Sequence, residues 1–321
     1  MNTKNLISSH ISKVLLVVVI LFGHNYSYSQ NQTDAKMGEI LNSGDLFRLK
    51  EEYPPLKGSI SVKMLNVGRG NHIYIPVEIN GITKDYIFDT GCSFGNFVSE
   101  KYAKEVGLDI LTDSIPVSGM TVGFVKLATT DSLKVGTMTY HNPIFMIAPP
   151  DREVDSLFTF DGVLGYHFIR DAQEIIIDNE SNTYIFPYKI STGTPNIYLS
   201  SNTPQLRIEY AEQPFDIIFD TGNVKSDLGN KFSKIFPESI SGLTEHTTSR
   251  GGFGGVSEIK AVTMPEFHFK VADTPVTLYN TEVVKYNTNG SQLFSGSLGA
   301  DFVLSFKRLT INYNKMFIRG E

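Results

Sequence analysis

The sequence predicts an all-β protein with two homologous lobes, preceded by a short N-terminal helical extension. Three observations carry this prediction. Alternation of apolar and polar residues, typical of strands, begins at Asn71 and continues almost to the C-terminus. One short motif occurs twice, and the segments around its two copies follow the same order. The chain of 321 residues has room for two domains, and its 41% of hydrophobic residues can form their cores.

The first 29 residues have the features of a cleavable export signal. Lys4 and Lys13 precede an apolar run at residues 14–22, and the Ser-Tyr-Ser sequence at 27–29 is a small-x-small cleavage site. A membrane-spanning helix needs about 20 apolar residues, so this run is too short to remain as an anchor. We therefore expect a secreted or periplasmic protein with no stable membrane span, whose mature N-terminus is Gln30.

The rest of the chain divides into an extension, two lobes and a linker. Residues 30–57 are polar with one helical patch, which the Tyr-Pro-Pro sequence at 53–55 ends. This extension is either a plain packing segment, which we favour, or a pro-segment. The first lobe, here called the first half, covers residues 58–189. A linker rich in Ser, Thr, Asn and Pro follows at 190–203, and the second half covers 204–321.

The repeated motif is an apolar run that ends in Phe-Asp-Thr-Gly. Its copies lie at residues 85–91 and 216–222, so the acidic residues are Asp89 and Asp220. A strand can present a carboxylate at its end in this way, and the glycine allows other backbone to approach closely. The alternative is a pair of ordinary strand exits with Asp capping a turn. It is less favoured because both copies share the Phe and the apolar run.

The elements of the first half follow from local signals. Asn80-Gly81 is a strong hairpin turn, Ser99 is a helix cap, and Gly107 ends the same helix. The expected elements are strands at 72–79 and 84–88, a helix at 99–108, a glycine-punctuated hairpin at 118–125, further strands to 148, and closing strands at 174–178 and 183–186.

The second half repeats this order. Its expected elements are a hairpin at 206–219, a helical turn at 230–236, a glycine-rich hairpin at 250–255, and closing strands at 308–313 and 315–318. An apolar Leu-Gly element also recurs. Leu164 follows Asp89 by 75 residues, and Leu298 follows Asp220 by 78 residues. These similar intervals indicate a duplicated chain.

At these residues the sequence resembles the aspartic proteases, in the form in which a single chain carries both halves of the site. The resemblance implies two β-barrel lobes related by a pseudo-two-fold axis, with the two aspartates forming a catalytic dyad. It implies hydrolysis of a peptide or protein substrate by a water molecule between the aspartates, with no cofactor or metal. The residues implicated are the catalytic Asp89 and Asp220, Thr90 and Thr221, which would lock the two loops together, and Gly91 and Gly222, which would bring backbone N–H groups near the carboxylates.

The two glycine-rich hairpins would act as flaps that hold an extended peptide, as in that family. The residues expected to bind substrate there are Gly119, Gly123, Phe124, Phe253 and Gly254. The alternative is that both are ordinary turns that contain glycine.

The sequence departs from the family pattern at a few positions. Cys92 and Asn223 follow the two motifs where Ser, Thr or Ala is common, Val224 comes next in the second half, and Ser297 replaces an apolar residue before Leu298. Cys92 is a poorer hydrogen-bond donor than Ser. We therefore expect a weakly acidic to near-neutral pH optimum, which Cys92→Ser would shift downward. Asn223 and Val224 also leave open a catalytically silent relative that binds peptides.

Other classes of site find little support. Cys92 is the single cysteine, so no internal disulfide can form, and we interpret it as a small buried residue. No histidine has metal-ligand spacing, and the serine-hydrolase and phosphate-loop motifs are missing. The net charge of −6, without any basic run, gives no indication of nucleic-acid binding. We expect a monomer. A purely structural exported β protein would require the repeat to be a coincidence.

Overall fold

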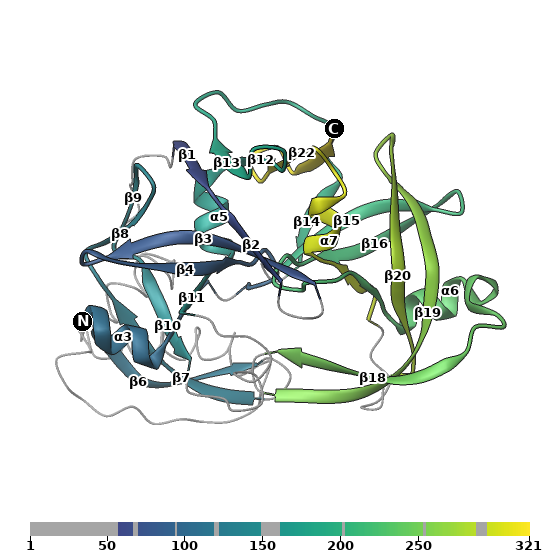
Figure 1. Ribbon diagram of the computed structural model, residues 1–321, viewed down its shortest axis with the longest axis horizontal. Helices are drawn as coiled ribbons and strands as arrows, with labels where there is room; N and C mark the ends of the chain where they lie inside the picture. Colours follow the sequence, from purple (N-terminus) through teal and green to yellow (C-terminus); the bar gives the residue numbers. More distant parts are fainter. Residues whose placement is uncertain are drawn as a thin grey trace, which may run out of the picture.

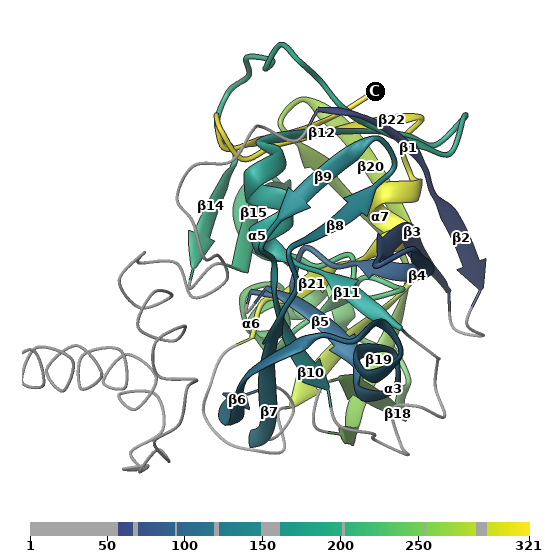
Figure 2. The same ribbon diagram turned by 90° about the vertical axis from the view of Figure 1, so that its left-hand side faces the viewer.

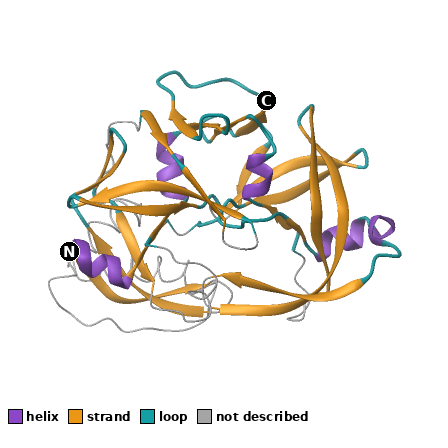
Figure 3. Cartoon of the chain, viewed as in Figure 1, coloured by secondary structure: helices purple, strands orange, loops and turns teal. Residues whose placement is uncertain are grey.

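The chain folds mainly into β-strands, as the computed structural model shows (Figures 1 and 3). The structure describes residues 57–66, 70–93, 95–118, 122–148, 161–200, 203–252, 255–286 and 294–321. Over these residues the strands form three sheets, which confirms the all-β class expected from the sequence. The expected signal peptide, and the helical extension up to residue 56, lie outside the described residues. In the part of the chain that is described, no helix is long and apolar enough to cross a membrane.

The first half forms a ten-stranded sheet in the order β6-β7-β10-β5-β11-β4-β3-β8-β9, with β2 paired to β3. Asn80 and Gly81, with φ of 49° and 81°, form the tight turn between β3 and β4 that the sequence predicts. The strands are β2 (Lys63–Asn66), β3 (Asn71–Ile79), β4 (Ile82–Phe88), β5 (Asn96–Ser99), β6 (Asp109–Ser118), β7 (Val122–Thr129), β8 (Ser132–Val135), β9 (Met138–His141), β10 (Ile144–Ala148) and β11 (Gly162–Leu164).

The second half forms an eight-stranded sheet in the order β14-β15-β16-β21-β17-β20-β19-β18. β14 lies within the segment that the sequence predicts to be a linker, where it pairs with β15 and buries Ile197. The sequence did not predict this short strand because the segment is rich in Ser, Thr, Asn and Pro, which are typical of loops. The strands are β14 (Ile197–Ser200), β15 (Thr203–Tyr210), β16 (Gln213–Phe219), β17 (Asp227–Leu228), β18 (Glu245–Gly252), β19 (Gly255–Val271), β20 (Thr274–Tyr286) and β21 (Gly296–Leu298).

A five-stranded sheet combines strands from both halves, in the order β1-β13-β12-β22-β23. These strands are β1 (Gly58–Ser61), β12 (Glu174–Asp178), β13 (Thr183–Phe186), β22 (Arg308–Asn312) and β23 (Phe317–Gly320). The two halves meet where β12 pairs antiparallel with β22. Figures 1 and 2 place this sheet on the opposite side of the molecule from β6, β7 and β18.

Short helices connect the strands: α3 (Glu100–Val106), α5 (Tyr166–Ala172), α6 (Asn230–Ile235), α7 (Ala300–Leu304) and the 3-10 helix η1 (Pro237–Ile240). α3 has the expected caps, because the Ser99 side chain accepts the Tyr102 N–H and Gly107 adopts a left-handed conformation. α5 and α7 begin directly after the Leu-Gly elements of the two halves. Equivalent elements therefore occupy equivalent places along the two halves.

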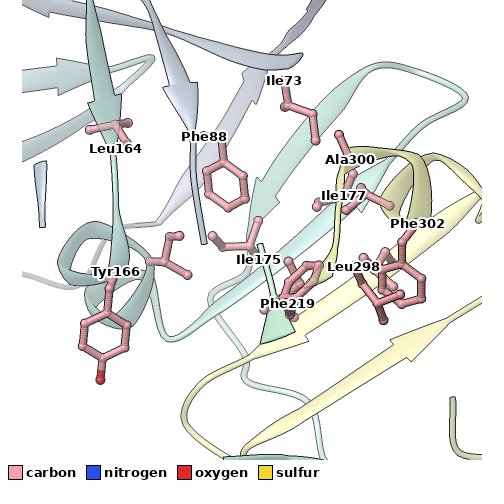
Figure 4. Packing of buried hydrophobic residues seen from close by; sticks show 14 of the residues in the cluster. Ile73, Phe88, Leu164, Tyr166, Ile175, Ile177, Phe219, Leu298, Ala300 and Phe302 are labelled. Carbon is pink, nitrogen blue, oxygen red and sulfur yellow. The ribbon is translucent and has the colours of Figure 1, made fainter. Parts of the chain in front are cut away.

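The hydrophobic core reaches the ends of the two strands that carry the repeated motif. Phe88 and Phe219, the last residues of β4 and β16, are fully buried in a cluster drawn from both halves (Figure 4). Leu164 pairs with Phe88 and Leu298 pairs with Phe219, each in a parallel register. Each fully buried side chain of this size contributes roughly 1.5–3 kcal/mol. The residues after Phe88 and Phe219 are thus held on a firmly packed base.

Candidate active site

The two Asp-Thr-Gly segments leave β4 and β16 as tight loops that meet between the halves. The Asp89 N–H donates to the Leu164 carbonyl at 3.0 Å, and the Asp220 N–H donates to the Leu298 carbonyl at 2.9 Å. The Leu-Gly strand of each half therefore fixes the backbone of the aspartate in the same half. The replacement of an apolar residue by Ser297 does not prevent this contact in the second half.

The Asp89 and Asp220 side chains, here called the carboxyl pair, lie against each other. A Cβ atom at Gly91 would overlap the Asp220 carboxyl, and one at Gly222 would overlap the Asp89 carboxyl. The two carboxyl groups also share a hydrogen bond. Glycine is thus the residue that allows each loop to approach the carboxyl of the other.

Thr90 and Thr221 join the two loops through four hydrogen bonds. Each hydroxyl oxygen accepts the backbone N–H of the other threonine at 3.0 Å. The Thr90 hydroxyl donates to the Phe219 carbonyl at 2.9 Å, and the Thr221 hydroxyl donates to the Phe88 carbonyl at 2.7 Å. Both threonines are fully buried, so neither can exchange these partners for water.

Backbone N–H groups hold one oxygen of each carboxyl. Gly91 and Cys92 donate to Oδ1 of Asp89 at 2.8 and 2.9 Å, and Gly222 donates to Oδ1 of Asp220 at 3.0 Å. Such bonds to an ionised oxygen are stronger than neutral ones and favour the charged form of the acid.

Burial has the opposite effect and is the stronger one. Desolvation raises the pKa of Asp89 well above its usual range, and the neighbouring charge of Asp220 raises it further. Desolvation also raises the pKa of Asp220, against the backbone N–H groups and the Arg250 charge, which lower it. The pair therefore holds a shared proton more readily than free carboxyls do. Both aspartates remain partly accessible to solvent, so water can reach them.

The four residues that depart from the family pattern all have structural partners. The Cys92 thiol donates to the Gly95 carbonyl at 3.0 Å, whereas the contact with Asp89 comes from the Cys92 backbone. The Asn223 side chain donates to Ser297 Oγ at 2.9 Å, which pairs two departures with each other. The backbone and side chain of Val224 pack against Gly70 from the first half. These departures leave the carboxyl pair in place.

His72 is a site residue that the sequence did not indicate. It lies in β3, is 2% exposed, and its Nε2 is 3.0 Å from the Gly222 carbonyl oxygen. A carbonyl only accepts, so Nε2 carries the hydrogen and donates it. Desolvation lowers the pKa of His72, which favours this neutral ring. A single histidine in a strand pattern gives no warning of a contact with a loop 150 residues further on.

The structure describes two of the five predicted flap residues. Gly123 and Phe124 lie in β7, paired with β6, and the Phe124 side chain is 49% exposed. Gly119, Phe253 and Gly254 lie outside the described residues. The roles of all five in substrate binding stay predictions.

Comparison with known proteins agrees with the resemblance in the first half. Residues 75–168 match the aspartyl protease family, a range that includes Asp89 but not Asp220. This part of the chain is therefore similar to the aspartic proteases. No curated protein sequence matches the chain.

Several solved structures are similar over most of their own length. An aspartic proteinase from Irpex lacteus has 12% identity and a TM-score of 0.46, with 81% of this chain and 96% of that chain covered. Conglutin gamma, a basic 7S globulin from lupine seeds, has 9% identity and a TM-score of 0.48, with coverages of 82% and 94%. A retropepsin-like aspartic protease from Rickettsia conorii has 19% identity and a TM-score of 0.30, with coverages of 42% and 94%.

Proposed function

We propose that the protein is an exported aspartic endopeptidase, in which Asp89 and Asp220 activate a water molecule to hydrolyse peptide bonds. The observation that carries the proposal is the carboxyl pair itself. Two aspartates 131 residues apart in sequence are buried against each other, held by reciprocal threonine contacts, and still partly accessible to solvent. Burying two acids together costs free energy. A chain that keeps both is best explained by a function that uses them.

The shared proton gives the two carboxyls different tasks. The ionised carboxyl takes a proton from water as the water oxygen bonds to the peptide carbonyl carbon, while the protonated carboxyl donates its proton to the carbonyl oxygen. The C–N bond of the resulting tetrahedral diol then breaks as one carboxyl delivers a proton to the leaving amine, while the other carboxylate takes a proton from a diol hydroxyl, which restores the singly protonated pair. The products are a carboxylic acid and an amine. The backbone N–H groups on Oδ1 of each aspartate keep both carboxyls oriented throughout.

A catalytically silent peptide-binding protein is the alternative that Asn223 and Val224 left open. Silence of this kind requires that these residues disturb the carboxyl pair. Asn223 instead contacts Ser297, and Val224 contacts Gly70. The geometry therefore favours the enzyme.

We further propose that the enzyme is monomeric and has two lobes, residues 58–189 and 204–321, related by a pseudo-two-fold axis. The reciprocal contacts of Thr90 and Thr221 support this symmetry. Export follows from the signal-like residues 1–29. Mass spectrometry of the exported protein should find Gln30 at the N-terminus, whereas Met1 retained on membrane-bound protein would contradict export.

The function is tested by incubating the protein with a mixed peptide library from pH 3 to 8, with and without a statine-type inhibitor. We expect internal cleavage that the inhibitor blocks and that Asp89→Asn and Asp220→Asn each abolish. Cleavage that survives in either Asn variant at the wild-type rate would refute the proposed mechanism. Peptide binding without cleavage at any pH would support the silent alternative.

A further inference from the structure

An ion pair lies beside the carboxyl pair, on the side of the second half. Arg250, near the end of β18, donates through Nη2 to Oδ2 of Asp227, the first residue of β17. The guanidinium carbon lies 4.4 Å from the centre of the Phe294 ring, a cation–π contact. The Asp227 side chain is 13% exposed and that of Arg250 is 29% exposed. A nearly buried carboxylate and an aromatic ring therefore fix a guanidinium that still meets solvent.

Asp227 is held in turn by β21, the strand whose Leu298 carbonyl accepts the Asp220 N–H. Ser297 donates to Oδ1 of Asp227 through its backbone N–H at 3.0 Å and through its hydroxyl at 3.2 Å. The Ser297 hydroxyl accepts the amide of Asn223, the residue directly after the second motif. A continuous series of contacts thus positions Arg250 relative to the second Asp-Thr-Gly loop.

The strand register shows how near Arg250 lies to the reaction. β17 pairs with β21 and β21 pairs with β16, with Ser297 opposite both Asp227 and Ile218. Asp227 is therefore two strand spacings, about 10 Å, from the strand that ends at Asp220. The Arg250 charge is close enough to lower the pKa of Asp220. An extended peptide advances about 3.4 Å per residue, so about three residues of a bound peptide span the same distance.

The guanidinium retains hydrogen-bonding capacity. It carries five N–H donors, and among the residues that the structure describes Asp227 is its one hydrogen-bond acceptor. The planar arrangement of these donors suits a carboxylate, which it can bind through two parallel bonds. The corresponding residue of the first half, seven positions after its aspartate, is the neutral Asn96, which contacts Ile144 and Gly165. Among the described residues, the second half therefore has an acid paired with a guanidinium at this position, and the first half has a neutral amide instead.

We propose that Arg250 selects substrates that carry a carboxylate within about three residues of the cleaved bond, on the side bound by the second half. The inference rests on the proposed proteolytic function. The carboxylate is that of an Asp or Glu side chain or of a free peptide C-terminus. Arg250 contacts it, and Asp227 is a positioning residue that holds Arg250.

The test compares matched peptides that share one cleaved bond. Each peptide pair carries Glu or Gln at one of the three positions on either side of that bond, with both ends blocked, and a further pair has a free or an amidated C-terminus. We expect kcat/KM to favour the carboxylate by about tenfold at one position or at the C-terminus, mainly through KM. A preference for the free C-terminus alone identifies the terminal carboxylate as the source, and a preference for Glu identifies the side chain.

The variants separate the charge of Arg250 from its structural role. Arg250→Gln combined with Asp227→Asn removes both charges, so no buried carboxylate is left unpaired, and the carboxylate preference should fall to near one. Asp227→Asn alone keeps the guanidinium, so this variant should still prefer peptides that carry a carboxylate. Arg207→Gln is the matched control, because Arg207 also pairs with an aspartate, Asp216, but on the exposed surface of β15. It should leave the preference unchanged.

The outcomes distinguish the two proposals. If wild-type protein cleaves no peptide, the proposed function fails. If it cleaves peptides with equal kcat/KM for Glu and Gln and for both kinds of C-terminus, or if the double variant keeps the wild-type preference, the role of Arg250 is refuted. If the double variant does not fold, the wild-type preference must still weaken as salt rises from about 0.05 to 0.5 M, since an accessible ion pair is screened. A preference that does not respond to salt would overturn the inference.

Discussion

Thr90 and Thr221 each accept the backbone N–H of the other, at 3.0 Å, and each donates its hydroxyl to the carbonyl that precedes the aspartate of the opposite half. Every one of these four bonds crosses between the halves. The position of Asp89 thus depends on residues of the second half, and that of Asp220 on residues of the first. The carboxyl pair belongs to the contact between the halves.

Replacing either threonine with valine should destabilise the protein. Thr90→Val or Thr221→Val removes a buried hydroxyl and leaves an N–H and a carbonyl without partners, at a cost of about 2–4 kcal/mol in the free energy of unfolding. Urea denaturation measures this loss. Thr90→Ser and Thr221→Ser keep the hydroxyl and should lose less than about 1 kcal/mol. Equal stability of the Val and Ser variants would show that the hydroxyls do not bind the halves together.

Neutralising one member of the carboxyl pair should stabilise the folded protein at neutral pH while removing hydrolysis. The pKa values of Asp89 and Asp220 are raised in the folded state above the usual 3.8. Their contribution to stability is therefore complete below pH 4 and is lost as pH rises through the raised values. Asp89→Asn or Asp220→Asn avoids this loss.

Thermal unfolding at pH 4 and pH 7 tests the prediction. The Asn variants should have a higher Tm than wild type at pH 7, and the difference should shrink at pH 4. A constant difference across this range would mean that the carboxyls are not perturbed in the folded state.

The pH profile of hydrolysis should lie in the weakly acidic to near-neutral range. One proton is required on the carboxyl pair, and burial raises the pKa values that define the profile. The structure corrects the part assigned to Cys92, because its thiol donates to Gly95 and its backbone N–H contacts Asp89. Any residue except proline supplies that N–H. Cys92→Ala and Cys92→Ser should therefore shift the acid limb of kcat/KM by less than about 0.3 pH units. A larger downward shift in the Ser variant alone would restore the side-chain explanation.

His72 should support the second loop through its hydrogen bond to Gly222. His72→Leu leaves the Gly222 carbonyl without this donor and should cost about 1–3 kcal/mol of stability and reduce kcat. His72→Gln, which can still donate, should lose less. If the Leu and Gln variants had the same stability and kcat, the bond would not matter.

The lowered pKa of His72 also predicts how the stability of the protein changes as pH falls. Since burial lowers it, the contribution of His72 to stability is present above pH 6.5 and is lost as pH falls through the lowered value. The Tm of wild type should therefore fall more steeply than that of His72→Gln below about pH 6. Parallel curves would contradict a buried neutral ring.

Local sequence patterns predicted much of the fold, but they did not predict which distant strands pair with each other. Asn80-Gly81 and the caps of α3 depend on adjacent residues, so the sequence reveals them. Both Asp-Thr-Gly loops could be found because the chain repeats itself. The pairing of β12 with β22 joins segments more than 120 residues apart and has no local signature.

The same limit applied within the site. Asn223 and Ser297 each depart from the expected pattern, and only the three-dimensional structure shows that they are partners. Asp227 and Arg250 carry opposite charges, but nothing in a sequence distinguishes such a pair from two solvated residues. Hydrogen-bond partners across different strands require the register of the sheet, which the sequence alone does not supply.

The five-stranded sheet has a consequence for the order in which the protein is made. β1, β12 and β13 emerge from the ribosome first, whereas β22 and β23, which complete their sheet, are synthesised more than 100 residues later. The Asp89 loop likewise has all its partners only after Thr221 and Asp220 have been synthesised. A chain that stalls before residue 308 lacks the β12–β22 pairing that joins the halves. Until β22 has been made, the threonine contacts between the two Asp-Thr-Gly loops have to hold the halves together without it.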